Sequence, residues 1–437
     1  MALESIPSPP GSYERLWISL ITLWYLIWQR LQPRHTLEAV VIDARRGGAD
    51  RLCPQGKPLS KGLQSTATTS YSDARQRLPL AWVRGCFLKL AASLASLGAQ
   101  PSPELPVELL DGSTKRLRPY GDIAAEFPAH RTRRKKSYWC LARVLVSFCA
   151  ATGIATGALI ASIHVSEQAM AVQLMLEAAK RVLYIGDRNF GVWRVARGAV
   201  QSGGHALVRL TQVRARRLLG KKHLPAFLDM PVLWTPTSHD QVDPGLKKES
   251  VKGRLIIIQA HQRGHRPQKL YLFTTLTDVV AYPPKRLLQF YGWRWQVELN
   301  FRTVKSTMQM DQSETKSANM VRKEFYAGLM AYNLVRGLMA AAAVQAGCST
   351  AELSFARVHG LLVSVLTDMF VVWMSGPLGR QRLLWLLAEA SAARLPQRSK
   401  PRPSEPRAQY YPPQVFPKIK GSRAQARQVL KILLAKN

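Results

Sequence analysis

Residues 291–311, YGWRWQVELNFRTVKSTMQMD, limit the possible folds of this chain most strongly. The segment has no proline and, after its second residue, no glycine, so the sequence predicts a continuous helix. Arg294, Glu298 and Lys305 follow Tyr291 by three, seven and fourteen positions. At about 100° per residue, these offsets place all four side chains on one helical stripe roughly 60° wide.

Two interpretations of this stripe stay open from the residues alone. Arg294 and Glu298 can form an i,i+4 ion pair on a solvent-exposed helix, worth a few tenths of a kcal/mol. Alternatively, a carboxylate flanked by two cations stays ionised at neutral pH and suits a divalent metal ion. The neighbouring guanidinium and ammonium groups suit phosphate.

The charge of the chain favours a polyanionic partner. Its 437 residues include 62 Lys and Arg against 27 Asp and Glu, a net charge of +35. Nucleic acid is the simplest partner, although ribosomal, chromatin and membrane-surface proteins have similar compositions. The length predicts two or three domains.

The pattern YxxRxxxExxxxxxK resembles the YREK signature of a large family of bacterial insertion-sequence transposases, the cut-and-paste DDE enzymes of the insertion sequence four family. The resemblance implies that Glu298 is the third metal-binding carboxylate and that two catalytic aspartates precede it. It also implies that Tyr291, Arg294 and Lys305 contact DNA phosphates near the cleaved bond. The implied cofactor is Mg²⁺ or Mn²⁺, as two ions.

Two aspartates stand where the resemblance requires them. Asp111 follows the strand candidate 107–110, and Asp-Gly-Ser is on its own a common strand-ending turn. Asp187 follows the short apolar strand 181–185, where it can instead cap a helix beginning near Phe190. The family carries its first aspartate in a DGS or DGT context followed by Phe-Pro, and its second in Asp-Arg-x-Phe. Both contexts are present, which implies that Asp111 and Asp187 are catalytic metal ligands.

The apolar pattern predicts an α/β fold. We expect strands at 107–110, 142–150, 154–163, 181–185 and 203–210, with a helix capped by Ser166 before the fourth strand. The resemblance implies an RNase H-like, mixed five-stranded sheet. Residues 211–282 show no helical signal and two strand candidates, 254–259 and 269–275, which predicts a β-rich insertion.

In members with such an insertion, an aromatic residue stacks on a base flipped out of the DNA. Tyr271 and Trp234 are the candidates here, and aromatic residues at such positions more often belong to the core.

The domains expected from these patterns are a helical, DNA-contacting N-terminal region (1–100), a catalytic core (101–210 and 283–345), the insertion (211–282) and a helical C-terminal region with a basic tail (346–437). The first region contains helix candidates at 16–31 and 68–94 and a strand candidate at 39–44. The last part of the chain contains helix candidates at 323–343, 353–373, 381–394 and 424–436. The basic run 130–136 is either a solvated loop or a phosphate contact.

No membrane segment or zinc site is expected. The apolar run 16–28 is too short to span a bilayer, and 144–163 reads as two buried strands joined at Thr152-Gly153. The five cysteines lack ligand spacing and indicate reduced thiols in a cytoplasmic, nucleoid-associated bacterial protein.

The resemblance implies a transposase that hydrolyses DNA at transposon ends and joins the freed 3′-hydroxyls to target DNA. Its implied partners are transposon-end DNA, target DNA and a second copy of the chain in a homodimeric synaptic complex. The alternative is a catalytically inactive, transposase-derived DNA-binding protein.

Overall fold

The computed structural model describes residues 7, 9, 16–31, 36–53, 57–97, 105–131, 136–238, 240, 243, 245–260, 268–313, 315–367, 376–396, 422, 424–425 and 427–428. Contacts divide the chain into a main unit, Met1–Ala260 with Gln268–Pro396, and a small unit, His261–Pro267 with Gln397–Asn437. The elements described below belong to the main unit. In the small unit, the described residues at 424–425 and 427–428 are helical, and the rest of the expected helix 424–436 lies outside the described residues.

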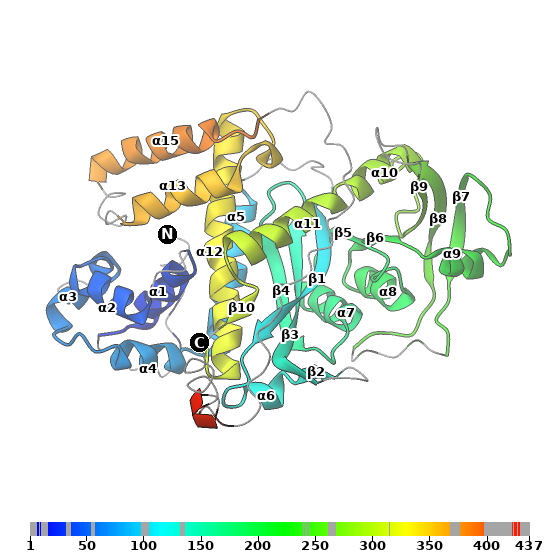
Figure 1. The fold of residues 1–437 in the computed structure, drawn as a ribbon. Helices are drawn as coiled ribbons and strands as arrows, with labels where there is room; N and C mark the ends of the chain where they lie inside the picture. The colour runs from blue at the N-terminus through cyan, green and yellow to red at the C-terminus, as the bar shows by residue number, and fades with distance from the viewer. Residues whose placement is uncertain are drawn as a thin grey trace, which may run out of the picture. The chain divides into compact units, whose positions relative to one another are not determined.

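A mixed sheet lies at the centre of the main unit, in the order β2-β3-β1-β5-β6-β9-β8-β7, with β4 beside β3 and β10 beside β1 (Figure 1). Its strands are β1 (Val107–Leu117), β2 (Ala129–Arg131), β3 (Lys136–Cys149), β4 (Ala155–Ser162), β5 (Leu183–Gly186), β6 (His205–Arg209), β7 (Leu228–Trp234), β8 (Val251–Ala260), β9 (Gln268–Thr274) and β10 (Gln312–Ser313). The α/β class is therefore confirmed, but the sheet has ten strands among the described residues where the sequence predicted five.

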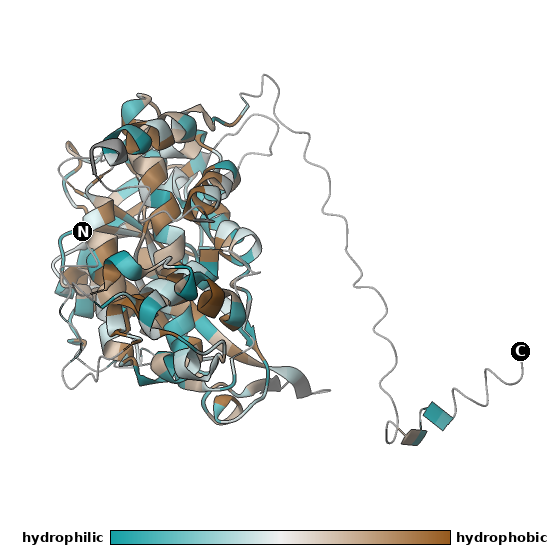
Figure 2. Cartoon of the chain, turned by 90° about the vertical axis from the view of Figure 1, so that its left-hand side faces the viewer, coloured by the Kyte–Doolittle hydropathy of each residue, from teal (hydrophilic) through white to brown (hydrophobic). Residues whose placement is uncertain are grey.

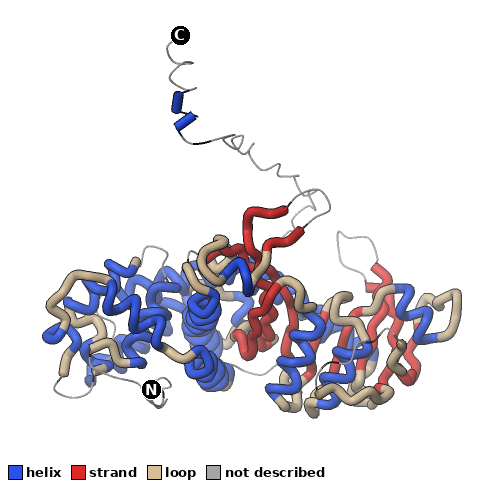
Figure 3. The backbone as a smooth tube through the Cα atoms, turned by 90° about the horizontal axis from the view of Figure 1, so that it is seen from below, coloured by secondary structure: helices blue, strands red, loops and turns tan. Residues whose placement is uncertain are grey.

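The helices gather at one end and along both faces of the sheet (Figures 1 and 3). They are α1 (Ser19–Leu31), α2 (Leu37–Arg45), α3 (Leu59–Gly62), α4 (Thr69–Arg77), α5 (Leu80–Ala95), α6 (Ile123–Glu126), α7 (Glu167–Ala178), α8 (Trp193–Gln201), α9 (Gln212–Leu219), α10 (Pro284–Gly292), α11 (Arg294–Arg302), α12 (Ala318–Gln345), α13 (Phe355–Thr367) and α15 (Gly376–Ala392), with single turns at Asp50–Leu52, Thr303–Thr307 and Thr350–Glu352.

Two hydrophobic cores sandwich the sheet, because successive side chains of a strand point to opposite faces. Figure 2 shows hydrophobic and hydrophilic residues mixed along the helices and strands. Leu109 and Ile185 join the core under α5, α11 and α12, whereas Leu110 and Tyr184 join the core under α7 and α8. Asp111 follows Leu109 by two positions along β1, so its side chain belongs to the face that α11 covers.

The predicted turn at Asp111-Gly112-Ser113 is wrong. β1 continues through these residues to Leu117 because their backbone pairs with β3, with Asp111 opposite Val146 and Gly112 opposite Leu145. The long ladder outweighs the local turn preference of Asp-Gly.

In the N-terminal region, the helix predicted at 16–31 is confirmed as α1, but the strand predicted at 39–44 is wrong. Residues 37–45 form α2, capped by Thr36, whose side chain accepts a hydrogen bond from the Ala39 amide. Val40, Val41 and Ala44 lie on one helical face and are buried. The cap and this face outweigh the β preference of the two valines. The helical segment 68–94 is confirmed as α4 and α5, which bend by 80° between them.

The predictions for the strands of the central region are confirmed. β3 and β4 pair as an antiparallel hairpin, turning at Gly153 with φ of +72°. Ser166 caps α7 by accepting a hydrogen bond from the Ala169 amide. The run 130–136 lies at the ends of β2 and β3, and residues 132–135 lie outside the described residues.

The absence of helix predicted for 211–282 is wrong, because α9 follows β6 directly. Thr211 caps α9 and Gly220 ends it with φ of +68°. The strands of this region are β7, β8 and β9, and β9 pairs antiparallel with β6. They therefore extend the central sheet.

The continuous helix predicted over 291–311 is also wrong. α10 and α11 meet at Trp293, and a π-helical turn at Thr303–Thr307 follows α11. Lys305 lies within this π turn, so the four residues of the motif are spread over three helical segments.

α12 is the central helix of the main unit and packs against α1, α5, α13 and α15. The helices expected at 323–343 and 381–394 are confirmed as parts of α12 and α15, and that at 353–373 as α13, beyond which residues 368–375 lie outside the described residues. Among the described residues, α12 is long and apolar enough to cross a membrane, and 78% of its most apolar stretch is buried inside the protein. α4 with α5 passes the same composition test only as a bent pair.

Candidate catalytic centre

Strand register brings Asp111 and Asp187 to the same edge of the sheet. β1 and β5 are parallel, with Leu109 opposite Ile185. Each aspartate follows its strand partner by two residues, so the two stand at equivalent positions. Asp111 lies where β1 continues past the end of β5, and Asp187 lies just beyond that end.

The carboxylate of Asp187 acts electrostatically on Asp111. Burial, together with the nearby carboxylates of Asp187 and Glu167, raises the pKa of Asp111 to about 6. The hydrogen bond from the Gly112 amide to Asp111 Oδ1, 2.9 Å long, and the Arg294 guanidinium oppose this shift. Negative charge thus accumulates at this edge of the sheet.

Asp187 does not cap a helix. Its Oδ1 accepts a hydrogen bond of 2.8 Å from the Asn189 amide in a local turn, and α8 starts at Trp193 after the N-cap Val192. The carboxylate of Asp187 is therefore not bound to a helix N-terminus.

Helix α11 carries Arg294 and Glu298 over the face of the sheet to which Asp111 belongs. Arg294 lies close enough to Asp111 and Asp187 to affect them both electrostatically. Its Nη2 donates to Glu298 Oε1 at 2.9 Å, while the Glu298 side chain is 44% exposed. The i,i+4 ion pair expected from the sequence is thus formed, and the same guanidinium links Glu298 to the two aspartates.

Tyr291 lies under this group rather than on the helix surface. It is buried, and within the described residues its hydroxyl has no hydrogen-bond partner. Burial raises its pKa, while the nearby guanidinium groups of Arg294 and Arg209 lower it. The guanidinium groups of Arg209 and Arg294 beside this hydroxyl are of the kind that binds phosphate.

Lys305 lies at the other end of the same helical stretch. Together with Ser113, Thr114 and Lys115 it lines a small cavity between β1 and the π turn. The motif therefore follows β1, from Arg294 beside Asp111 to Lys305 beside Ser113. Of the predicted stripe, Tyr291, Arg294 and Glu298 interact with one another across the joint at Trp293, whereas Lys305 lies in the π turn that interrupts the helix.

The metal-binding set is only partly assembled. No group of three His, Cys, Asp or Glu side chains within the described residues is arranged to hold a metal ion. Asp111 and Asp187 fit an oxygen-liganded divalent cation, because their crowding leaves negative charge that a cation would neutralise. Glu298 joins them only if its carboxylate exchanges Arg294 for the metal.

Sequence reasoning missed three residues of this centre. Arg209, at the end of β6, lies beside Tyr291. Glu167, at the start of α7, lies beside Asp111, and Asn189 connects Glu167 to Asp187. The sequence pattern places Glu167 only in the first turn of the helix capped by Ser166; its position five residues after the end of β4, at the same sheet edge, was the available signal.

Tyr271 and Trp234 lie in β9 and β7 and pack against the core under α7 and α8. Trp234 contacts Phe273 edge-to-face, with ring centroids 4.7 Å apart. Both aromatic rings are half-buried, and their role as stacking platforms stays a prediction.

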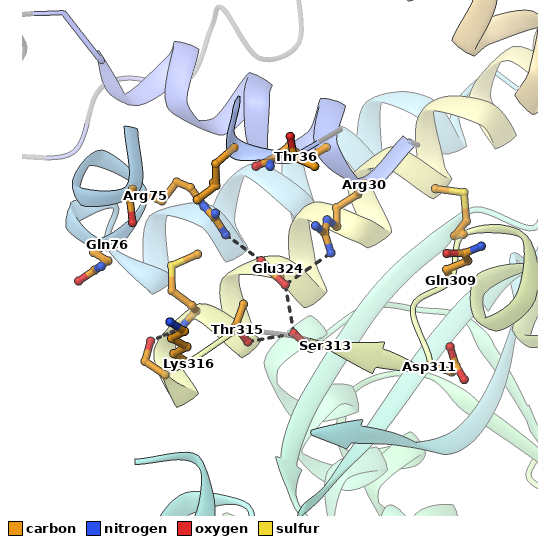
Figure 4. Close-up of a pocket in the computed structure, with 16 residues that line it drawn as sticks. Arg30, Thr36, Arg75, Gln76, Gln309, Asp311, Ser313, Thr315, Lys316 and Glu324 are labelled. Atoms are coloured by element: carbon orange, nitrogen blue, oxygen red, sulfur yellow. Dashed lines mark hydrogen bonds and ion pairs between the residues drawn. The ribbon is translucent and has the colours of Figure 1, made fainter. Parts of the chain in front are cut away.

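A separate, larger pocket of about 870 Å³ lies between the N-terminal helices and the start of α12 (Figure 4). Its acidic centre is Glu324, whose carboxylate binds Arg75 at 2.7 Å and Arg30 at 3.5 Å and accepts a hydrogen bond from Ser313 Oγ at 3.1 Å. This pocket contains none of the residues that the motif predicted.

Comparison with known proteins agrees with this geometry. The family described as Transposase DDE domain matches residues 104–334, more than half of the chain and the part that holds Asp111, Asp187, Glu298 and Lys305. The chain is 25% identical over 359 residues to the transposase InsG for insertion sequence element IS4 of Escherichia coli (strain K12), covering 79% of this chain and 76% of that protein.

Among solved structures, the piggyBac transposase synaptic complex with hairpin DNA aligns with 89% of this chain and 80% of its own, at 10% identity and a TM-score of 0.40, a similarity too low to define the fold. The sequence matches do define the family: this chain is a DDE transposase of the insertion sequence four family.

Proposed function

We propose that this transposase cuts DNA at the ends of its element with a centre formed by Asp111, Asp187 and Glu298. The observation that carries the proposal is the parallel register that places Asp111 and Asp187 at equivalent positions, under a helix that holds Glu298. Strands β4-β3-β1-β5-β6 would then correspond to the five-stranded RNase H-like core, with β7–β9 as an inserted extension of the sheet.

Members of this family depend on divalent metal ions, and the residues here are oxygen donors suited to Mg²⁺ or Mn²⁺. When bound, two such ions activate the attacking oxygen and stabilise the leaving oxygen of an in-line displacement at phosphorus. Asp111 and Asp187 would hold them in the protein as it stands. Glu298 would complete the set when DNA phosphate takes over Arg294, since a guanidinium can bind phosphate with two donors.

The positions of the cationic side chains indicate where the DNA phosphates would bind. Arg294 faces the aspartates, Arg209 lies beside the Tyr291 hydroxyl, and Lys305 lies further along β1. A DNA strand lying along β1 would meet a guanidinium clamp near the cleaved bond and a point charge beyond it. We further propose that two copies of the chain assemble on a pair of transposon ends, in the bacterial cytoplasm, before the freed 3′-hydroxyls attack target DNA.

The test is a nicking assay on the end sequences of the element. With Mg²⁺, the unmodified protein should nick these ends, and Glu298→Ala should lower the rate by at least about 10³-fold while end binding in a gel shift stays within about twofold. Glu389→Ala, which removes an exposed glutamate from α15, is the matched control and should cleave normally. Nicking by Glu298→Ala at the normal rate would exclude Glu298 as the third ligand. End binding without nicking by the unmodified protein would indicate an inactive DNA-binding relative.

A further inference from the structure

A hydrogen-bonded clamp connects the start of α7 to the turn that holds Asp187. Asn189 Nδ2 donates to Glu167 Oε2 at 2.6 Å. Gln168 Nε2 donates to the Asn189 side-chain oxygen at 3.2 Å and to its backbone oxygen at 2.8 Å. The backbone amide of Asn189 in turn donates to Asp187 Oδ1 at 2.8 Å. Both ends of the Asn189 side-chain amide are thus matched, one to an acceptor and one to a donor.

Glu167 also lies against β1, on the face of the sheet opposite to α11. A Cβ atom built on Gly112 would lie 2.7 Å from Glu167 Oε1 and as close to its Cγ. Arg143 lies on the same side, with Nη1 3.6 Å from Glu167 Oε1 and Nη2 donating to the Ile163 carbonyl. The glutamate is therefore held between β1, β3 and the Asp187 turn, with its side chain 20% exposed.

We propose that Glu167 is a positioning residue for the catalytic centre: through Asn189 it fixes the orientation of Asp187, and through its contact with Gly112 it supports β1 beside Asp111. This inference rests on the proposed function, because it assigns Glu167 a role only if Asp187 binds metal. A carboxylate that orients a metal ligand through a hydrogen bond typically contributes 10- to 100-fold to metal affinity or activity.

The position of Glu167 favours this role over that of a fourth metal ligand. Its Oε2 is taken by Asn189, and its Oε1 faces Gly112 and Arg143 on the side of the sheet away from α11. A purely structural helix start is also a poorer explanation, since Ser166 already caps α7. Glu167 instead contacts Gly112, which directly follows Asp111, and Asn189, which lies two residues after Asp187.

The test exchanges the two polar groups of the clamp. Asn189→Asp places a carboxylate against Glu167 and should raise the Mg²⁺ concentration needed for half-maximal nicking by about tenfold. Combining it with Glu167→Gln reverses the hydrogen bond, because the new amide at position 167 can donate to the new carboxylate at position 189. The net charge of the pair is the same as in the unmodified protein. This double variant should return to within about threefold of the unmodified protein. Glu167→Ala, which removes the acceptor, should resemble Asn189→Asp.

A second readout does not depend on cleavage. Binding of Mn²⁺ to the DNA-free protein, measured by calorimetry, should weaken by about tenfold in Glu167→Ala and in Asn189→Asp, and recover in the double variant. Glu177→Ala on the same helix, which removes an exposed ion pair with Arg84, is the control and should bind Mn²⁺ normally. A merely structural role would lower the melting temperature without the recovery in the double variant.

Asp187→Asn separates the two proposals. If it abolishes Mn²⁺ binding and nicking while Glu167→Ala matches the unmodified protein in both, Glu167 has no positioning role and the proposed function stands. The same conclusion applies if the double variant is no better than Asn189→Asp alone. If Asp187→Asn itself cleaves and binds Mn²⁺ normally, the proposed function is wrong and the role of Glu167 falls with it.

Discussion

The molecule holds two clusters of charged side chains that differ in how their charges are balanced. In the pocket between the N-terminal helices and α12, the buried carboxylate of Glu324 meets two guanidinium groups, those of Arg30 and Arg75. At the sheet edge, the carboxylates of Asp187 and Glu167 both lie near Asp111, and the guanidinium of Arg294 beside it is shared with Glu298. The carboxylate of the first cluster is therefore paired twice within the protein, whereas the carboxylates of the second cluster outnumber the guanidinium groups beside them.

The first cluster therefore stabilises the fold, whereas the second is suited to binding a cation. Glu324 lies on α12, whereas Arg30 and Arg75 lie on α1 and α4, so their ion pairs tie the N-terminal helices to the central helix (Figure 4). The raised pKa of Asp111 records the opposite situation, in which folding buries a carboxylate and brings the carboxylates of Asp187 and Glu167 near it. Substitutions should therefore destabilise the protein in the pocket and stabilise it at the sheet edge.

The largest effect on stability is expected for Glu324→Ala. Its removal leaves the guanidinium of Arg75, only 11% exposed, without its carboxylate, and should lower the free energy of unfolding by about 3 kcal/mol. Urea denaturation followed by circular dichroism measures this change. A loss below about 1 kcal/mol would mean that the pocket is not held by its ion pairs, and the contrast between the two clusters would disappear.

An effect of opposite sign is expected for Asp111→Asn in metal-free buffer. Because the pKa of Asp111 is raised to about 6 in the folded protein, the folded state binds its proton more tightly than the unfolded state does. The contribution of Asp111 to stability is therefore full below about pH 4 and is lost as the pH rises through about 6. Asp111→Asn has no carboxylate to titrate and so avoids this loss. Its free energy of unfolding should equal that of the unmodified protein near pH 4 and be about 2 kcal/mol higher at pH 7.

The measurement is a pair of denaturation series between pH 4 and pH 7 with a chelator present. Adding Mn²⁺ should stabilise the unmodified protein, because the cation binds the folded state and compensates the negative charge of Asp111. The effect on the variant should be much smaller, because it lacks this carboxylate. Equal stability at every pH would show that Asp111 is not crowded by its neighbours.

The smallest effect is expected for the exposed ion pair that joins β1 to the start of β10. Arg116 Nη2 lies 2.8 Å from Asp311 Oδ2, with side chains 47% and 35% exposed. Asp311→Asn should change the free energy of unfolding by less than about 1 kcal/mol, because water screens this pair. A loss as large as that of Glu324→Ala would show that burial does not distinguish the charged groups of this protein.

The sequence predicted the strands of the central region and the family well, because both depend on local signals. Apolar runs bounded by turns mark β3, β4, β5 and β6, and the spacing from Tyr291 to Lys305 is specific. What it missed depends on contacts between distant segments. The strand through Asp111 and Gly112 exists because β3 pairs with it, and α2 forms because Val40 and Val41 find a buried surface under α1.

The same limit applies to the site. The roles of Asp111, Asp187 and Glu298 follow from motifs, whereas Glu167 and Arg209 have no motif of their own. Strand pairing brings them to one edge of the sheet: Glu167 through β4, β3 and β1, and Arg209 through β5 and β6. The half-buried positions of Tyr271 and Trp234 likewise follow from strand pairing that the sequence pattern did not reveal.

The π turn at Thr303–Thr307 allows the segment between Glu298 and Lys305 to lose one residue without disturbing the helix before it. A π turn closes its hydrogen bonds over one more residue than an α turn, so it stores one extra residue in the helical path between Glu298 and Lys305. Shortening the chain by one residue there would let the turn wind as ordinary α-helix while Val297 and Phe301 kept their buried face. A deletion in α11 between Arg294 and Glu298 would instead rotate these two side chains by about 100° relative to each other and break their ion pair.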